Sequence, residues 1–341
     1  MCVALLSCGT EQRLTGLALS SAERPPPRIA RPVPPMNFRI DVRLARTTPP
    51  AASPRADEPV PSRYREWDVD ELVRAMSERP VRRQLGSYRS TSPIYRLQLE
   101  GGLEVAFKPA IPGQETWWRH DVVAWRLARL LGIADRVPPA VARRVPVAAL
   151  GDAVLNDGLI TARDEANTVP GVVIFWLPVL RVTFLDGPRQ RAQWQPWLDA
   201  RRPMPRGHDA VVAAEISSVL VFDYLQANED RWNDANIRAD EADHLVYRDN
   251  NVGWFAFKME DLTWGRTTLY GTQRFSRALV AALERATPEA LRDEVARADG
   301  AGSPLIDART LRAYGERRRV VLDHVRELRA RLGDEAVLAF P

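Results

Sequence analysis

The sequence contains very little cysteine and histidine, and it has no long apolar run. Its two cysteines, Cys2 and Cys8, stand at the extreme N-terminus, so we expect neither disulfides nor thiolate chemistry in the folded part. Four scattered histidines show no metal-ligand spacing, which argues against a zinc site. No apolar stretch reaches the roughly 20 residues that a membrane-spanning helix needs. The composition, 45% hydrophobic and 27% charged, is that of an ordinary globular protein without a transmembrane segment.

Lysine is also scarce. Of the 48 lysine and arginine residues only Lys108 and Lys258 are lysines. A general drift towards arginine explains the arginines, but it does not explain why lysine was kept at these two positions. The formal net charge of +4 is mildly basic, and the basic residues are spread along the chain rather than gathered in blocks. We therefore expect no nucleic-acid partner.

Residues 1–62 differ in composition from the remainder. The segment MCVALLSCGT is similar to the end of a bacterial lipoprotein signal, with Cys8 as the lipid-anchored residue, although its apolar part is short and no basic segment precedes it. Either the true start lies upstream or the similarity is accidental. Between Pro25 and Pro61 there are eleven prolines, which predicts a disordered tether. An extracytoplasmic lipoprotein and a cytoplasmic protein both stay open.

A globular pattern begins at about residue 63. The spacing predicts a short helix over 68–78 with Asp68 as its N-cap. Alternating apolar and polar residues around a Gly-Gly pair predict a β-hairpin over 94–109. An amphipathic helix is expected over 121–132, with Asp121 in its first turn.

Further elements follow in the second half. We expect a buried strand over 171–178, a long apolar helix over 208–228 feeding into a polar loop, and a C-terminal helix over 318–333. Residues 179–207 are rich in arginine, tryptophan and proline, and we interpret them as a surface insertion carrying part of an acceptor surface through Trp194 and Trp197.

The order of these elements, strands first and helices later, predicts an α+β fold with two lobes. Residues 63–178 would form a small β-rich N-lobe. Residues 179–341 would form a larger helical C-lobe that carries the polar loop.

Lys108 ends the second strand of the predicted hairpin, where it can point into a cleft. A compact ammonium on a long stem suits phosphate oxygens, and the planar guanidinium of arginine is not equivalent to it. An acid on the following helix could orient this lysine, and the candidates are Asp121 and Glu115. The plainer interpretation is a surface lysine, with Asp121 serving only the helix dipole.

Residues 228–251 hold five of the eight asparagines together with several aspartates. Such side chains disfavour helix and strand interiors, so we expect a loop or a loop between short strands. If 245–247 form a strand, Asp249 follows its end beside the loop that carries Asp230 and Asn236. Their oxygens suit a hard divalent cation. A solvated loop that binds nothing is the alternative, whereas an EF-hand is excluded because its glycine and final glutamate are missing.

Three segments in this order resemble the secretory-pathway protein kinases of the Golgi casein kinase type. They are FKPAIPGQET, WRHDVVAWRLARLLGIADRVPPAVAR, and FDYLQANEDRW together with the later RDNN. That family belongs to a wider atypical-kinase group that includes the phosphatidylinositol kinases and the HipA-like toxin kinases. The resemblance covers roughly residues 85–260 and implies an atypical protein-kinase-like fold.

Carried over position by position, the resemblance implies that Lys108 binds the phosphates of ATP and that Asp121 stands where the family has its lysine-pairing glutamate. It implies that Asp230 is the catalytic aspartate, that Asn236 is a metal ligand and that Asp249 is the principal metal ligand. The implied reaction moves the γ-phosphoryl group of ATP to a hydroxyl of a protein Ser/Thr or a sugar, with Mg²⁺ or Mn²⁺ as cofactor.

Four departures from the family pattern keep alternatives open. Asp121 is one methylene shorter than glutamate, so Glu115 remains an alternative partner for the lysine. Trp232 stands where relatives have histidine, and the longer spacing after it makes Asn233 a rival metal ligand. The disulfides of the animal enzymes are missing, and the turn expected over the phosphates, 85–93, has a single glycine. A nucleotide-binding pseudokinase that scaffolds a partner, or an enzyme of the same fold that transfers AMP, would also fit.

Overall fold

The computed structural model describes residues 63–88, 93–111, 113–151, 165–183, 185–232, 236–254, 263–297 and 304–341. The lipoprotein-like segment with Cys8, the proline-rich tether, Lys258, Asn233 and residues 89–92 of the 85–93 turn lie outside the described residues. The described residues, from 63 to 341, belong to one compact unit. None of the helices in the described part of the chain is both long and apolar enough to cross a membrane.

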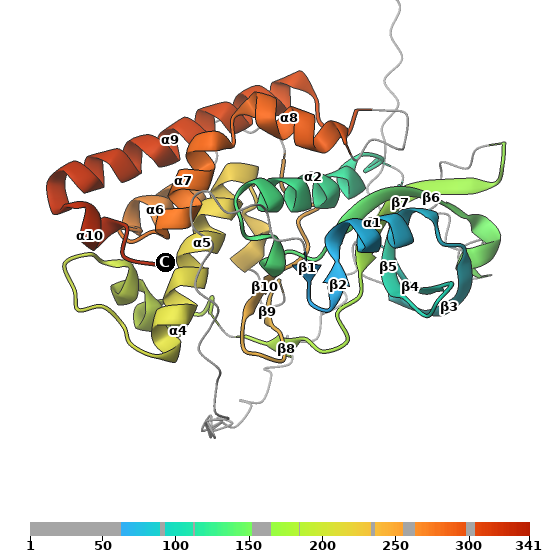
Figure 1. The fold of residues 1–341 in the computed structure, drawn as a ribbon, viewed down its shortest axis with the longest axis horizontal. Helices are drawn as coiled ribbons and strands as arrows, with labels where there is room; N and C mark the ends of the chain where they lie inside the picture. The colour runs from blue at the N-terminus through green and yellow to red at the C-terminus, as the bar shows by residue number, and fades with distance from the viewer. Residues whose placement is uncertain are drawn as a thin grey trace, which may run out of the picture. The chain divides into compact units, whose positions relative to one another are not determined.

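A five-stranded antiparallel sheet, in the order β3-β4-β5-β7-β6, dominates the first part of this unit (Figure 1). Its strands are β3 (Val81–Tyr88), β4 (Ile94–Leu99), β5 (Glu104–Pro109), β6 (Ala140–Pro146) and β7 (Thr168–Phe175). The predicted hairpin is confirmed as β4 and β5, joined through Gly101 and Gly102, whose φ angles of +80° and +86° favour glycine. The predicted strand over 171–178 is confirmed as β7, which begins three residues earlier.

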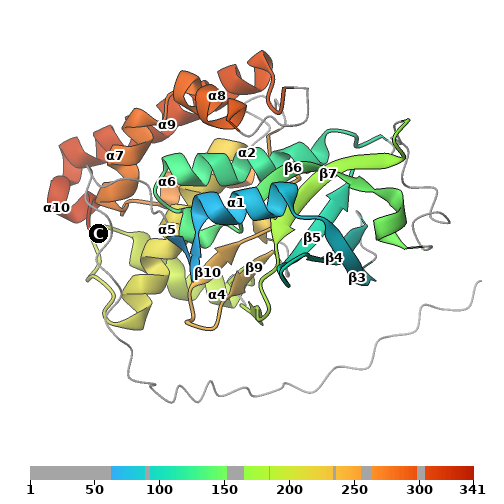
Figure 2. The same ribbon diagram turned by 45° about the vertical axis from the view of Figure 1, so that its right-hand side comes forward.

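Two helices pack on strands β6 and β7 (Figure 2). One is α1 (Val69–Glu78), which follows the short pair β1 (Arg63–Tyr64) and β2 (Trp67–Asp68). The Asp68 carboxylate accepts hydrogen bonds from the backbone N–H groups of Asp70 and Glu71, so the predicted N-cap is confirmed. The other is α2 (Trp117–Leu130). It begins four residues before the predicted start, and the placement of Asp121 in its first turn is therefore wrong.

The second part of the unit is mostly helical. Its main elements are α5 (His208–Gln226), α6 (Thr263–Gly271), α7 (Arg277–Arg285), α8 (Pro288–Ala296), α9 (Ala308–Leu332) and α10 (Asp334–Val337). Helix α9 packs against α5, α7, α8 and α10, and it buries Val321, Val325 and Leu328 as its apolar periodicity predicts. One cluster of buried apolar side chains runs from α1 and the sheet into these helices, and the predicted α+β layout is confirmed.

Residues 179–207 are more ordered than predicted. They contain β8 (Arg181–Val182), α4 (Pro188–Trp194) and the 3-10 helix η3 (Gln195–Leu198). The ring of Trp194 lies 5.5 Å from that of Trp232, and its Nε1 donates to the carbonyl of Leu185 at 2.7 Å. Trp194 is 2% exposed, so its placement on an acceptor surface is wrong. Burial of this large apolar indole stabilises the fold, which explains why Trp194 lies in the core.

The polar stretch after α5 forms short elements, as its composition predicts. It contains the 3-10 helix η4 (Asp230–Trp232) and the strands β9 (Ile237–Ala239) and β10 (Leu245–Tyr247). These two strands form a small antiparallel sheet with β8. Asp249 follows β10 two residues after its end, which is where the sequence predicts it.

A candidate nucleotide and metal site

A cavity of about 810 Å³ brings together residues that are far apart in the sequence. Its size is typical of small-molecule sites. The polar part of its lining includes Lys108, Asp121, Asp230, Asn236 and Asp249. The apolar part includes Ile94, Ala106, Ala140, Ile174 and Leu177. The predicted convergence of these polar side chains on one cavity is therefore present in the structure.

The ammonium of Lys108 is held between two carboxylates. Lys108 lies in β5 opposite Val172 of β7, and its Nζ donates to Asp121 Oδ2 at 3.0 Å and to Asp249 Oδ1 at 2.9 Å. Burial by itself lowers the pKa of Lys108, but the charges of Asp121 and Asp249 outweigh burial and raise that pKa above its usual value. The lysine is thus a fixed positive charge inside the cavity.

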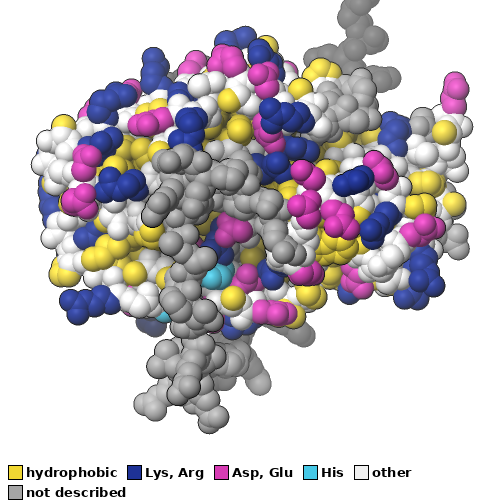
Figure 3. Space-filling view, in the orientation of Figure 1, with side chains coloured by type: hydrophobic (Ala, Val, Ile, Leu, Met, Phe, Trp, Pro, Cys, Tyr) yellow, Lys and Arg dark blue, Asp and Glu magenta, His cyan; other side chains and the backbone are white. Residues whose placement is uncertain are grey.

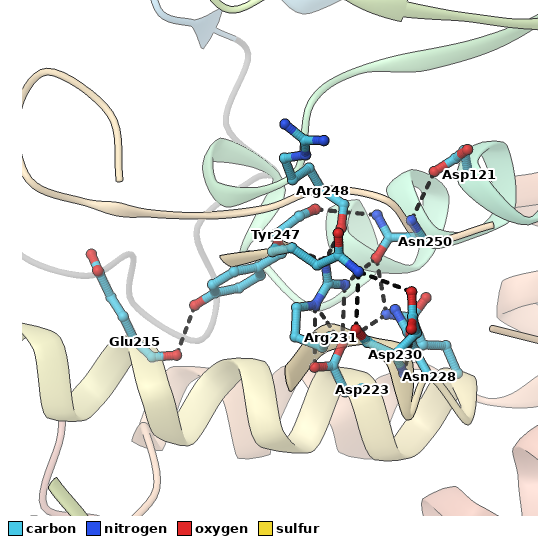
Figure 4. A network of polar contacts seen from close by, with 11 residues as sticks. Asp121, Glu215, Asp223, Asn228, Asp230, Arg231, Tyr247, Arg248 and Asn250 are labelled. Atoms are coloured by element: carbon cyan, nitrogen blue, oxygen red, sulfur yellow. Dashed lines mark hydrogen bonds and ion pairs between the residues drawn. The ribbon is translucent and has the colours of Figure 1, made fainter. Parts of the chain in front are cut away.

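Asp121 connects helix α2 to the loop after β10. While its Oδ2 accepts from Lys108, its Oδ1 accepts from the backbone N–H of Asn250 at 2.9 Å (Figure 4). The shorter side chain therefore reaches the lysine without lengthening the contact. Glu115 is exposed and lies apart, and its carboxylate accepts from the backbone N–H of Gly113 at 2.8 Å. Of the two candidates the structure brings only Asp121 to the lysine.

Both carboxylate oxygens of Asp249 are engaged by cations. Oδ1 accepts from Lys108, and Oδ2 accepts from Arg248 through Nε at 2.8 Å and Nη2 at 2.6 Å. Burial raises the pKa of Asp249, yet Lys108 and Arg248 together lower it well below the usual range. The backbone of Asp249 is left-handed, with φ of 55°, a conformation that aspartate and asparagine tolerate better than most residues.

Asp230 and Asn236 lie side by side in the polar loop. The Nδ2 of Asn236 donates to the Oδ2 and to the carbonyl oxygen of Asp230, at 2.9 Å each. A carboxylate oxygen and a carbonyl oxygen accept hydrogen bonds but cannot donate them, so Asp230 must be contacted by the amide nitrogen of Asn236. The amide oxygen of Asn236 is therefore turned away from Asp230. The backbone N–H of Asp230 donates in turn to Asn228 Oδ1 at 3.1 Å. This arrangement leaves an amide oxygen available as a cation ligand.

Arg231 holds the polar loop in place, and sequence analysis missed it. Its guanidinium is buried and forms an ion pair with Asp223 of α5, with Nη2 3.1 Å from Oδ1. It also donates to the carbonyl of Arg248 and to Asn250 Oδ1, so one side chain ties α5 to both loops (Figure 4). The sequence does contain a signal for this role, because Asp223 and Gln226 are strongly polar residues near the end of an apolar helix. A buried carboxylate requires a partner.

The oxygen donors fit a divalent cation that also binds phosphate. Among the residues that the structure describes, no three His, Cys, Asp or Glu side chains lie close enough together to hold a metal by themselves. Mg²⁺ in phosphoryl-transfer sites typically uses one or two carboxylates, with phosphates and water completing its shell. Asp249, the amide oxygen of Asn236 and a nucleotide would provide such a set.

Charges are mixed on the molecular surface. On the face drawn in Figure 3, Lys and Arg side chains alternate with Asp and Glu side chains over the described part of the chain, without an extended area of one sign. The electrostatic field that would gather polyanions is thus weak on this face.

Comparisons with known proteins identify solved structures of similar fold. No protein-family model matches the sequence, and no curated protein matches it. Among solved structures, the Golgi casein kinase with Mn/ADP bound is 15% identical with a TM-score of 0.57, covering 79% of this chain and 78% of that one. A hydra Fam20 solved with sugar is 18% identical with a TM-score of 0.58, covering 79% and 91%. The chain thus has the two-lobed, atypical protein-kinase-like fold of the Golgi casein kinase, as its three sequence segments predict.

Proposed function

We propose that the protein is an ATP-dependent phosphotransferase that moves the γ-phosphoryl group to a hydroxyl of a protein Ser/Thr or a sugar. The observation that carries this proposal is the cluster of Lys108, Asp121 and Asp249 inside a cavity that Asp230 and Asn236 also line. Phosphoryl transfer mainly requires positioning and charge stabilisation, and these five side chains provide both.

Each side chain has a role that its surroundings support. Lys108, oriented by Asp121, contacts the phosphates of ATP. Asp230 accepts the proton of the acceptor hydroxyl as the acceptor oxygen forms its bond to the γ-phosphorus. The bond between that phosphorus and the bridging oxygen breaks, and ADP leaves with the electron pair. Asp230 is held for this task by the amide of Asn236.

Asp249 and Asn236 would hold the divalent cation. A bound Mg²⁺ or Mn²⁺ supplies positive charge that offsets the charge developing on the phosphate oxygens. The presence of Mn and ADP in the Golgi casein kinase structure supports this choice of cofactor. The sugar in the hydra Fam20 structure supports keeping a sugar hydroxyl among the acceptors.

A nucleotide-binding scaffold without turnover is the second candidate. The observation in its favour is the state of Asp249, both of whose oxygens are engaged by cations of the protein itself. Such a site could bind a nucleotide and yet lack a competent metal. Retention of two carboxylates at Asp230 and Asp249 favours activity instead.

Labelled ATP separates these functions. The full chain with Mn²⁺ is expected to transfer label from γ-labelled but not α-labelled ATP, to itself or to casein and sugar acceptors. Asp230→Asn and Asp249→Asn are each expected to reduce transfer by about 100-fold or more. Asp243→Asn is a matched control, because Asp243 also has a left-handed backbone, with φ of 65°, but lies on an exposed turn. Its activity should equal that of the wild type.

Three results would contradict the proposal in different ways. No thermal shift with ATP and Mn²⁺ would overturn nucleotide binding altogether. A metal-dependent shift without transfer to any acceptor would support the scaffold. Transfer of the α label would identify an AMP-transferring enzyme of the same fold.

A further inference from the structure

We propose that Arg248 occupies the metal-ligating oxygen of Asp249 in the nucleotide-free protein and moves to the nucleotide phosphates when the cation binds. Nucleotide and divalent cation would therefore bind cooperatively through this arginine. The inference rests on the proposed function, since it takes Asp249 to be a metal ligand.

The two cations on Asp249 divide its oxygens between them. Lys108 Nζ lies 2.9 Å from Oδ1, and Arg248 Nη2 lies 2.6 Å from Oδ2. A divalent cation at Oδ2 would need the space that the guanidinium fills. The two positive charges would also repel each other at this short range. Metal binding at Oδ2 thus requires the arginine to leave.

Arg248 is the cation of the two that can move. The Lys108 side chain is 7% exposed and is also held by Asp121, whereas the Arg248 side chain is 35% exposed. The carbonyl of Arg248 accepts from Arg231 and fixes the backbone, while its guanidinium points away from the buried network (Figure 4). The side chain can therefore rotate without any change in the loop.

Nucleotide phosphates offer the displaced guanidinium a new partner. Arg248 lines the same cavity as Lys108 and Asp230, so phosphates that Lys108 binds would share this cavity with the arginine. Arginine binds phosphate through two parallel hydrogen bonds, which offsets the lost contact with Asp249. When the cation binds without nucleotide, the displaced arginine enters solvent and gains no phosphate contact to offset its lost contact with Asp249.

This exchange predicts opposite effects of one substitution on two affinities. In Arg248→Gln, the cation no longer competes with a guanidinium, so Mn²⁺ alone should bind about fivefold or more tightly than in the wild type. The nucleotide in the presence of Mn²⁺ should bind about fivefold or more weakly, because a phosphate contact is lost. A merely structural role would weaken both.

The test uses the full chain and two binding measurements. Mn²⁺ alone is titrated and followed by electron paramagnetic resonance of the free ion, and a labelled non-hydrolysable ATP analogue with saturating Mn²⁺ is followed by equilibrium dialysis. Arg74→Gln is the control, because Arg74 is exposed on helix α1 and is not part of the cavity lining. Both affinities of this control should change less than twofold.

The outcomes separate this inference from the proposed function. If Asp249→Asn loses Mn²⁺ binding but Arg248→Gln binds Mn²⁺ no more tightly than the wild type, the inference is wrong and the metal site stands. If Asp249→Asn binds Mn²⁺ and nucleotide like the wild type, the proposed metal site itself is wrong. Arg248→Lys serves as a second variant if Arg248→Gln folds poorly. Because it keeps the positive charge, its affinities for Mn²⁺ and for the nucleotide should lie between those of the wild type and Arg248→Gln.

Discussion

At the scale of single residues, the position of the Lys108 ammonium depends on a glycine in the next strand. Gly171 of β7 faces Pro109, the neighbour of Lys108 in β5. A Cβ atom at position 171 would lie 2.4 Å from the Lys108 carbonyl oxygen and 2.6 Å from the Phe107 ring. Only glycine lets β5 approach β7 this closely, so it fixes the strand that carries the lysine.

Gly171→Ala should therefore destabilise the protein. The new methyl group would force β5 and β7 apart, and overpacking of this kind typically costs about 1–3 kcal/mol. Urea unfolding followed by circular dichroism would measure this loss. Gly86→Ala in β3 is the matched control, because a Cβ atom there meets nothing within 4 Å. Equal stability of the two variants would refute the close approach of the strands.

At the scale of elements, Arg231 joins α5 to the loop after β10. Its guanidinium is buried and contacts Asp223, Asn250 and the carbonyl of Arg248. Burial raises the pKa of Asp223 to about 6, with Arg231 acting in the opposite direction. Without Arg231 that carboxylate would be a buried charge lacking its ion pair.

Arg231→Met is accordingly expected to cost about 3–5 kcal/mol of unfolding free energy, since it leaves Asp223 uncompensated. Chemical denaturation would measure the loss. The double variant with Asp223→Asn should recover part of it, because the orphaned charge is then removed. If the losses of the two single variants simply add, Arg231 and Asp223 do not act as a pair.

Helix α9 makes the stability of the protein sensitive to acid through His324. The ring packs edge-on against Tyr270 and Phe275, and Nε2 lies 2.9 Å from the carbonyl oxygen of Thr272. Burial lowers the pKa of His324 below its usual value. As pH falls through about 6.5, the unfolded chain therefore binds a proton before the folded one does, and stability decreases.

His324→Gln keeps a donor for the Thr272 carbonyl but cannot titrate. Between pH 7.5 and pH 5.5, the unfolding free energy of the wild type should fall more than that of this variant. Thermal or urea unfolding at both pH values would measure the difference. Asp223 and the other histidines are present in both proteins, so their contributions to the pH dependence cancel in the comparison. An equal fall in both would show that His324 does not contribute.

At the scale of the whole molecule, the described part of 51–341 shares one hydrophobic core. Buried apolar side chains form a single cluster from Leu72 of α1 to Leu328 of α9, and α2 packs on the sheet as well as on α8. The β-rich part and the helical part are thus joined by one continuous core. The cavity lies where the two meet, with Lys108 from one and Asp249 from the other.

We expect this unit to unfold in one cooperative transition. Calorimetry should give a single peak, and tryptophan fluorescence and far-ultraviolet circular dichroism should show the same midpoint. A non-hydrolysable ATP analogue with Mn²⁺, each at about 100 times its dissociation constant, should raise the unfolding free energy by about 2.7 kcal/mol for a single bound complex and shift the whole transition. Two separate transitions, with only one responding to ligand, would contradict a shared core.

Several parts of the fold and site follow from local sequence patterns. Alternation and the Gly-Gly pair predict the hairpin that ends in Lys108, and the short apolar run 245–247 predicts the strand before Asp249. The composition of 228–251 predicts a polar loop with oxygen ligands. These features depend on residues close together in the chain, so propensity and periodicity suffice to find them.

Other parts are decided by the tertiary structure alone. The choice of Asp121 over Glu115 depends on where α2 begins and how it packs on β6 and β7, and Thr116 before the helix makes no side-chain capping hydrogen bond that would mark this start. The contact between Lys108 and Asp249 spans 141 positions of the sequence. The guanidinium of Arg248 on Asp249 depends on a side-chain conformation that the sequence does not encode locally. The sequence determines which charges are present, and packing determines which of them neutralise each other, because a buried charge is stabilised only by the groups that folding brings to it.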